Sequence, residues 1–168
     1  QTREWSLELQ QEASRDYLTG LLNRRGFQAA MDSLRKEDAP LALYLFDLDN
    51  LKSINDTFGH AEGDRHIRQF AQLLRSHTRE SDILSRYGGD EFVVVMPGAS
   101  EERIRGFAGR LEEEFEKLAF MPGLTFAWGA AIYDPDTDND LFSTCRRADK
   151  NMYMKKQKFY EDRMKRED

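Results

Sequence analysis

Apolar residues occur along this chain in two patterns, short continuous runs and stripes of helical spacing. The continuous runs are bounded by turn-forming residues and predict strands at 41–46, 83–87, 92–96 and 124–133. The stripes predict helices at 24–37, 63–77 and 100–118, with further helices expected at 50–57 and 141–163 and a break at Gly59. Strands that alternate with helices, plus one tight hairpin, predict an α/β fold with a mixed central sheet flanked by helices.

The first fifteen residues are mostly polar and carry one weak helical stripe. Trp5, Leu9 and Ala13 stand at i, i+4 and i+8. This spacing predicts a linker helix over residues 1–15, ahead of a single domain over residues 16–168. In the isolated chain we expect this helix to fray. In a longer protein, the same stripe could end a coiled linker from an upstream sensor domain.

Composition limits the classes of protein to which the chain can belong. A length of 168 residues suits one domain with a substantial core. No stretch reaches the roughly 20 apolar residues that span a bilayer, and no signal peptide opens the chain, so we expect no membrane segment. Cys145 is the single cysteine, which excludes an internal disulfide and fits a reducing cytoplasm. A net charge of −6 argues against nucleic acid as a partner, so a nucleotide would need local cations or metal ions.

The most specific stretch is RYGGDEF, residues 86–92, which continues into the apolar residues 93–96. Its two adjacent glycines permit a tight reversal with positive φ and leave room for a close ligand. Isolated buried charge is costly, so the carboxylates of Asp90 and Glu91 fit best if a cationic or hydrogen-bonding group lies over the turn. The alternative is an ordinary acidic hairpin tip.

Two further motifs accompany this stretch. FDLDNLKSINDTFGHAEGD occupies residues 46–64, and DYLTGLLNRR occupies residues 16–25. Together with RYGGDEF and a weaker fourth motif over residues 148–156, they make the chain resemble the GGDEF domain, the diguanylate cyclase family. The resemblance covers nearly everything from residue 16 to residue 158. It implies a fold like that of class III nucleotidyl cyclases and polymerase palms.

Carboxylates stand at the ends of two predicted strands, and adjacent strand ends can converge on one point. Asp47 and Asp90 with a backbone carbonyl, here that of Leu48, suit a hard cation, so Mg²⁺ is expected, with Mn²⁺ as the alternative ion. No cysteine or histidine pair competes for zinc. Asp47 alone could also be a strand-end or helix-capping residue. The resemblance implies that Asp47 and Asp90 bind the metal ions.

The resemblance further implies condensation of two GTP molecules into cyclic di-GMP with release of pyrophosphate. Asp90 is then also the proton acceptor. Lys52 contacts phosphate and stabilises the transition state, although a helix lysine is usually only solvated. Lys156 aligns with another phosphate-binding lysine. Glu91 supports the second metal ion or the 3′-hydroxyl, or it forms a structural salt bridge.

Guanine selection needs a carboxylate or an amide that faces the N1–H and the exocyclic amine of the base. The resemblance assigns this role to Asn55 and Asp64, with His60 beside them. The residue types alone also allow Asn55 to be a turn former and Asp64 to be the N-cap of the next helix. Gly88 and Gly89 are expected to let the nucleotide approach the hairpin backbone.

The chain departs from the family pattern in its last motif. Residues 159–161 are Phe-Tyr-Glu instead of Gly-Arg-Asn, so a phosphate-binding arginine is missing, and nearby lysines do not reproduce a bidentate guanidinium. The opening motif is present, and its Asp16, Asn23 and Arg24 are interpreted as scaffold that holds the linker. The leading hypothesis is an active cyclase. The alternatives are a non-catalytic receptor for GTP or cyclic di-GMP, and a cyclase that also accepts ATP.

Two more expectations concern assembly and inhibition. Each chain carries one site while the product joins two guanylates symmetrically, so two domains are expected to meet in a transient two-fold homodimer. Arg79 and Asp82 form an Arg-x-x-Asp pair, and Asp82 lies six residues before Gly88, where the resemblance places an inhibitory product site. Arginine can fork onto guanine or phosphate, and Asp82 can accept from the base. An exposed pair of this kind is otherwise only solvated charge.

Overall fold

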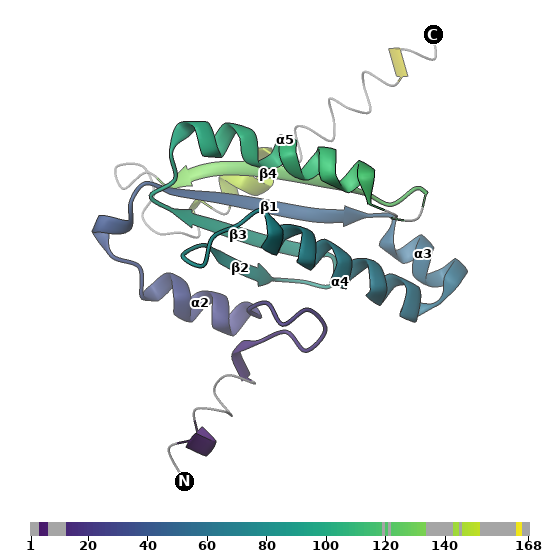
Figure 1. The fold of residues 1–168 in the computed structure, drawn as a ribbon, viewed down its shortest axis with the longest axis horizontal. Coiled ribbons are helices and arrows are strands. Elements are labelled where there is room, and N and C mark those ends of the chain that lie inside the picture. Colours follow the sequence, from purple (N-terminus) through teal and green to yellow (C-terminus); the bar gives the residue numbers. More distant parts are fainter. Residues whose placement is uncertain are drawn as a thin grey trace.

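The computed structural model describes residues 4–6, 13–118, 120, 122–133, 143–144, 146–151 and 164–165. Within these ranges its centre is a four-stranded sheet of order β2-β3-β1-β4 (Figure 1). The strands are β1 (Leu41–Asp49), β2 (Ile83–Arg86), β3 (Glu91–Pro97) and β4 (Thr125–Tyr133). They pair antiparallel, and an isolated bridge between Leu22 and Ser85 is parallel. The expected α/β class is confirmed.

β1 occupies the middle of the sheet and buries side chains on both faces. Tyr44 and Phe46 point into one core and Leu43 into the other, and each of the three is at most 1% exposed. A strand buried on both faces is a continuous apolar run in the sequence, which is why residues 41–46 predict it. The Tyr44 hydroxyl donates to the carbonyl oxygen of Ile104, and burial raises the pKa of Tyr44 to about 12.

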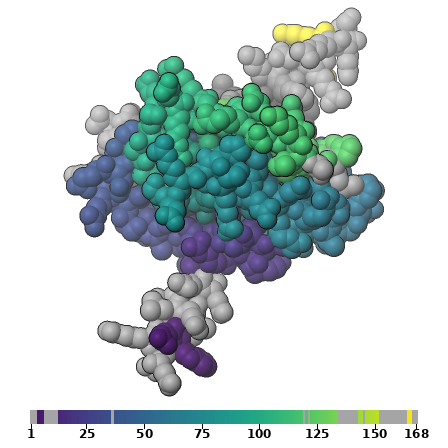
Figure 2. All heavy atoms as spheres, viewed as in Figure 1, coloured from purple at the N-terminus to yellow at the C-terminus, as the bar shows by residue number. Residues whose placement is uncertain are grey.

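Helices cover both faces of the sheet. The longer ones are α2 (Arg24–Asp32), α3 (Leu51–Phe58), α4 (His60–Ser76) and α5 (Glu101–Lys117). α3, α4 and α5 pack on the face that carries Tyr44 and Phe46, and α4 and α5 form much of the surface seen in Figure 2. On the other face, Phe27 and Met31 of α2 share a core with Ala148. The sheet is therefore the middle layer of a sandwich, as the sequence predicts.

Helix boundaries differ from the sequence expectation at two places. α2 ends early, at Asp32, and a short 3₁₀ helix follows at Lys36–Asp38. α4 begins early, at His60, because Gly59 with a φ of 93° ends α3 and starts α4 without a loop. Asp64 therefore lies inside α4, and the interpretation of Asp64 as the N-cap of this helix is wrong.

The two terminal helices fall largely outside the described ranges. Residues 146–151 are helical, as expected for the final helix, whereas Lys156 and residues 159–161 lie outside the described part of the chain. Leu9 of the first helix also lies outside it, and Trp5 is exposed. Among the described helices, none combines the length and apolarity that a membrane span requires.

Other parts of the chain form hydrogen bonds with both edge strands of the sheet. Along β2, the backbone of Leu22 forms hydrogen bonds of 2.9 and 3.2 Å with the strand. Along β4, the side chain of Asn151 donates to the carbonyl oxygen of Ala130 at 2.7 Å, and Arg147 donates to that of Ile132. These contacts occupy backbone groups that an edge strand otherwise leaves open.

Candidate active site

β2 and β3 meet in a turn formed by Tyr87, Gly88, Gly89 and Asp90. The amides of Tyr87 and Gly88 donate to the carbonyl oxygen of Glu91, at 2.8 and 3.3 Å. Neither glycine has a positive φ, so the expectation of a left-handed reversal here is wrong. Gly88 instead leaves room for the side chain of Glu91, because an added Cβ would lie 3.3 Å from that carboxyl group. Gly89 faces open space, where an added Cβ would meet nothing within 4 Å.

The ends of β1 and β3 bring acidic residues to one end of the sheet. The amide of Leu48 donates to the carbonyl oxygen of Asp90 at 2.9 Å, and Asp47 stands directly opposite Glu91 in the strand pairing. Asp47 and Asp90 are both half-buried. Their carboxylates and the Leu48 carbonyl all offer oxygen atoms as metal ligands, which is the ligand type that Mg²⁺ prefers. Because the described residues contain no group of three or more His, Cys, Asp or Glu that could hold a metal ion, water or substrate phosphates would have to complete its coordination.

A single residue, Asn50, turns the chain from β1 into α3. Its φ of 65° lies in the left-handed region, which asparagine tolerates better than most residues. Its side-chain amide donates to the carbonyl oxygen of Gly123 at 2.8 Å and so holds the junction against the loop before β4. Lys52 is exposed in the first turn of α3, and Asn55 is half-buried one turn later. The tight junction places both residues just beyond the acidic end of β1.

α3 and α4 fold back on each other at Gly59 and bring two motif residues into contact. Asn55 Oδ1 is buried and has no hydrogen-bond partner among the described residues. It lies against Gly63, where an added Cβ would be only 1.7 Å away. Asp64 is half-buried, and His60 is exposed at the start of α4. The structure therefore places Asn55 beside the residue that precedes Asp64.

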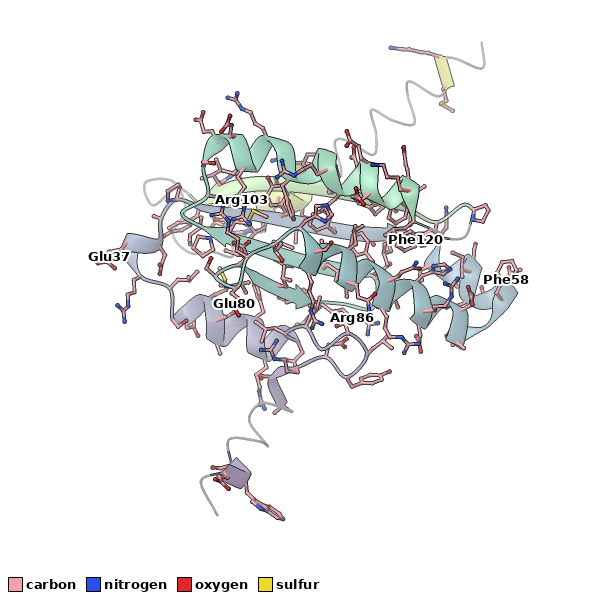
Figure 3. All side chains as sticks on the ribbon, viewed as in Figure 1. Glu37, Phe58, Glu80, Arg86, Arg103 and Phe120 are labelled. Atoms are coloured by element: carbon pink, nitrogen blue, oxygen red, sulfur yellow. The ribbon has the colours of Figure 1, made fainter. Side chains whose placement is uncertain are left out.

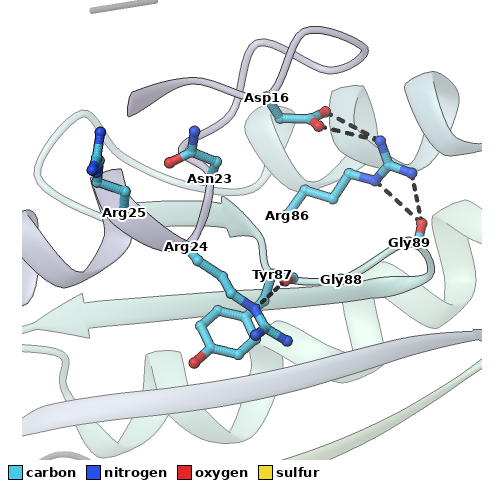
Figure 4. Close-up of a pocket in the computed structure, with 8 residues that line it drawn as sticks. All are labelled: Asp16, Asn23, Arg24, Arg25, Arg86, Tyr87, Gly88 and Gly89. Atoms are coloured by element: carbon cyan, nitrogen blue, oxygen red, sulfur yellow. Dashed lines mark hydrogen bonds and ion pairs between the residues drawn. The ribbon is translucent and has the colours of Figure 1, made fainter. Parts of the chain in front are cut away.

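The opening motif, residues 16–25, contacts and holds the turn between β2 and β3 (Figure 4). The carboxylate of Asp16 forms an ion pair with the guanidinium of Arg86 at 3.2 Å. Arg86 also donates through two nitrogens to the carbonyl oxygen of Gly89, at 2.8 and 3.2 Å. Arg24 donates to the carbonyl oxygen of Tyr87 at 2.9 Å, and its guanidinium lies 4.4 Å from the centre of the Tyr87 ring. The motif is scaffold, as expected: the Asn23 side chain donates to the carbonyl oxygen of Ala13 in the linker at 2.8 Å, and Asp16 and Arg24 also hold the hairpin.

A hollow of about 530 Å³ opens beside this hairpin, between the opening motif and residues 86–89. Asn23 lies on its wall and caps α2 by accepting from the amide of Gly26 at 2.9 Å. Arg24 and Arg25 line the hollow together with Arg86, so positive charge gathers at this side of an otherwise acidic chain.

Arg79 and Asp82 do not form an exposed pair of solvated charges, which was the alternative to a product site. Asp82 is only 9% exposed, and its carboxylate accepts from the backbone amide of Arg79 at 2.7 Å. The same carboxylate forms an ion pair with Arg103 of α5, the residue labelled in Figure 3. Arg79 itself is exposed. A hollow of about 510 Å³ beside it is also lined by Arg15 and Arg75, so the positive charge of this surface is larger than the motif indicates.

Sequence reasoning missed the contributions of Gly63, Arg75 and Arg103. A glycine inside a periodic helical stripe is a recognisable signal of close packing, so Gly63 could have been singled out. Arg75 donates to the carbonyl oxygen of Thr19 at 3.1 Å, and Arg103 pairs with Asp82. Neither arginine has a local signal, because both partners lie far away in the sequence.

His66 is a buried titratable residue on α4, on the side away from solvent. Burial lowers the pKa of His66, and the charge of Arg65 lowers it further, against the opposing effect of Glu62 at 3.4 Å. The hydrogen bond from Arg65 lowers the pKa of Glu62. The ring of His66 packs against Phe120, with 5.6 Å between the ring centres. His66 therefore belongs to the core.

Comparison with known proteins relates the sequence to one family. Residues 13–161 match the family model described as diguanylate cyclase, GGDEF domain. The diguanylate cyclase DosC of Escherichia coli K12 is 34% identical over 166 residues, which cover 90% of this chain and 36% of that protein. The response regulator PleD of Caulobacter vibrioides is 38% identical over 164 residues, with coverages of 90% and 35%. The chain therefore spans about a third of the length of these curated relatives.

Solved structures share the fold. A microbial GGDEF domain, studied for its interaction mode with cyclic di-GMP, has a TM-score of 0.76 and 34% identity, covering 89% of this chain and 94% of that one. The coiled coil and GGDEF domain of DgcB from Caulobacter crescentus, in complex with cyclic di-GMP, has a TM-score of 0.82 and 24% identity, with coverages of 93% and 87%. The DgcB comparison supports the fold alone.

Proposed function

Because this chain belongs to the diguanylate cyclase family of GGDEF domains, we propose that it condenses two GTP molecules into cyclic di-GMP with release of two pyrophosphates. The observation that carries the proposal is the hydrogen bond from the Leu48 amide to the Asp90 carbonyl oxygen. This bond fixes the ends of β1 and β3 together and so sets Asp47 and Asp90 at one end of the sheet. The proposal concerns this domain, with an upstream sensor domain controlling it in the full-length protein.

The chain's own groups can perform the proton transfer. Mg²⁺, or Mn²⁺ in its place, would be held by Asp47, the Leu48 carbonyl and Asp90. When bound, the ion lowers the pKa of the attacking hydroxyl and neutralises the leaving pyrophosphate. Asp90 accepts the proton of the 3′-hydroxyl of one GTP as that oxygen bonds to the α-phosphorus of the other GTP and pyrophosphate departs.

Other polar groups orient the triphosphate. Lys52 is exposed at the start of α3, where it can reach a phosphate. Lys156, from outside the described ranges, is assigned the same task. No atom lies within 4 Å of the place that a Cβ of Gly89 would take. The nucleotide can therefore approach the hairpin backbone at Gly89 and, in this proposal, at Gly88. Glu91 is exposed and supports the second metal ion or the 3′-hydroxyl.

In this proposal Asn55 and Asp64 recognise guanine, and His60 also contacts the nucleotide. The contact between Asn55 and Gly63 supports this, because it sets the amide beside the residue that precedes Asp64. A site that pairs with the N1–H and the exocyclic amine of guanine leaves its own polar groups unpaired when adenine enters. The domain therefore prefers GTP to ATP.

Two copies of the domain must meet for each reaction. One chain supplies one set of these residues, whereas two phosphodiester bonds related by symmetry form in the product. A transient two-fold homodimer supplies the second set. We place the encounter in the cytoplasm, with GTP as the substrate.

Cyclic di-GMP also acts as an inhibitor in this proposal, at the hollow that Arg79 lines. Arg15 and Arg75, which also line this hollow, favour an anionic ligand with guanine edges. The same hollow favours the second candidate function, a non-catalytic receptor for cyclic di-GMP. The two candidates differ in whether the domain forms the dinucleotide from GTP.

The decisive experiment is incubation of the domain with GTP and Mg²⁺, followed by chromatography for cyclic di-GMP. We expect the dinucleotide from the unmodified chain, and none from Asp90→Ala. A thermal unfolding curve of Asp90→Ala is the check that this variant folds. Glu101→Ala, at an exposed position on α5, is the matched control and should retain full activity. An active, folded Asp90→Ala protein would overturn the mechanism. An unmodified chain that binds cyclic di-GMP but forms none from GTP would favour the receptor.

A further inference from the structure

We infer that Gly63 is a specificity-determining positioning residue, because the absence of a side chain there lets the Asn55 amide lie between α3 and α4. The inference rests on the proposed function, in which Asn55 reads guanine. Gly63 would not touch the nucleotide. It would act by leaving to Asn55 the space that any larger residue would take.

The geometry leaves no room for a side chain at position 63. A Cβ added to Gly63 would lie 1.7 Å from Oδ1, 2.8 Å from Cγ and 3.3 Å from Nδ2 of Asn55. The carbonyl end of the amide, Oδ1 with Cγ, therefore occupies the place of that side chain. Only rotation of the Asn55 side chain, or separation of the two helices, could relieve the overlap.

The helix backbones are tied at their junction, so the side chain would move first. The amide of Gly59 donates to the carbonyl oxygen of Asn55 at 2.9 Å, and the amide of Gly63 donates to that of Gly59 at 3.4 Å. These bonds fix the backbone on both sides of the contact. The Asn55 amide, in contrast, has an Oδ1 without a hydrogen-bond partner among the described residues, and no bond of this atom resists rotation.

Two further observations indicate that the contact serves a ligand. Alanine is the better helix former, and position 63 lies inside α4, so helix stability alone disfavours glycine there. A buried carbonyl oxygen without a partner is also costly, which stability alone does not explain. Both costs make sense if the space at position 63 is kept free so that the Asn55 amide can take the orientation that the edge of a base requires.

The test compares two glycine-to-alanine changes in helices. Gly63→Ala displaces Asn55, whereas Gly109→Ala in α5 adds a methyl group that would meet nothing within 4 Å. Pyrophosphate release is measured with GTP and with ATP at one fixed protein concentration. We expect Gly63→Ala to lower the GTP-to-ATP ratio of kcat/KM by about tenfold or more, because the site loses a hydrogen-bonding group that discriminates between the bases. Gly109→Ala should keep the ratio of the unmodified chain.

Asn55→Ala supplies the second half of the test, since it removes the group with which a methyl at position 63 collides. In this background, Gly63→Ala should leave the ratio unchanged and raise the melting temperature. If Gly63→Ala alone fails to fold, the double variant should fold. An active Gly63→Ala with an unchanged ratio, or a double variant that still fails to fold, would overturn the inference. An unmodified chain that forms no dinucleotide would overturn the proposed function instead, while the melting temperatures would still report the contact.

Discussion

The side chain of Arg86 is held between the carboxylate of Asp16, 70 residues away in the sequence, and the carbonyl oxygen of Gly89. The two side chains of the ion pair are 14% and 13% exposed, so water screens the pair weakly. Arg86 uses three separate nitrogens for these contacts, which lysine cannot do. The position of the hairpin turn therefore depends on the segment before α2.

Removing this ion pair should affect both stability and catalysis. We expect Asp16→Ala to lower the free energy of unfolding by about 1–3 kcal/mol, because the partly buried Arg86 loses a charged hydrogen-bond partner. The rate of dinucleotide formation should fall with it, since the Gly89 carbonyl is then held less firmly. Urea denaturation and initial rates measure the two effects.

An exposed ion pair provides the control for Asp16→Ala. Glu101 and Arg105 of α5 are 84% and 81% exposed. Glu101→Ala should therefore change the free energy of unfolding by less than about 1 kcal/mol and leave the rate unchanged. Equal effects of the two substitutions would show that the Asp16–Arg86 pair does not position the hairpin.

Specific activity should depend on protein concentration. If two domains must meet for each turnover, tenfold dilution in the dilute regime lowers the fraction of paired domains by up to about tenfold. Initial rates per milligram over a wide dilution series measure this dependence. A flat profile would contradict an encounter between separate domains.

Arg79→Ala should relieve product inhibition. We expect initial rates within about twofold of the unmodified chain and a dissociation constant for cyclic di-GMP raised about tenfold, which is 1.4 kcal/mol. The measurements are a progress curve to high product and calorimetric titration with cyclic di-GMP. Arg105→Ala on α5 is the matched control. Unchanged affinity in Arg79→Ala would place the product site elsewhere.

Asp82→Ala should act through folding, unlike Arg79→Ala. Its carboxylate is the partner of Arg103, whose side chain is only 12% exposed. Removing one member of a buried ion pair costs about 3–5 kcal/mol. We therefore expect a clear loss of stability in denaturant titrations. A variant as stable as the unmodified chain would show that Arg103 finds another partner.

The neutral form of His66 should make stability depend on pH. Burial, and then the charge of Arg65, lower the pKa of His66 in the folded state. As the pH falls below about 6.5, His66 therefore takes up a proton in the unfolded chain before it does so in the folded chain. The stabilisation is complete above that pH and is lost as the pH falls toward the folded-state pKa. His66→Phe keeps the packing on Phe120 and should flatten this dependence. Denaturant titrations between pH 5 and pH 7 that gave parallel curves for both proteins would contradict the prediction.

Much of the fold is predictable because it follows from local patterns. β1 buries both faces, so residues 41–46 stand out as a continuous apolar run. The α3–α4 boundary was harder, because Gly59 serves as the end of one helix and the start of the next. The sequence shows that a break occurs there. It does not show that Gly59 alone separates the helices.

The candidate site is less predictable, because its supporting contacts join distant parts of the chain. Motif order identifies Asp47 and Asp90, and their placement follows from the pairing of β1 with β3. The partners of Arg86 and Asp82, in contrast, lie on other elements. In the sequence, charged residues of this kind look like parts of a solvated surface, and only the packed structure shows which of them are paired.

The contacts along β2 and β4 also bear on how copies of this domain can collide. An open sheet edge is a template on which a strand of another molecule can add, and such growth leads to aggregation. Here Leu22 occupies one edge, and Asn151 and Arg147 occupy carbonyl oxygens along the other. If two domains meet as we propose, these contacts leave fewer open backbone groups on which a strand of another copy could add.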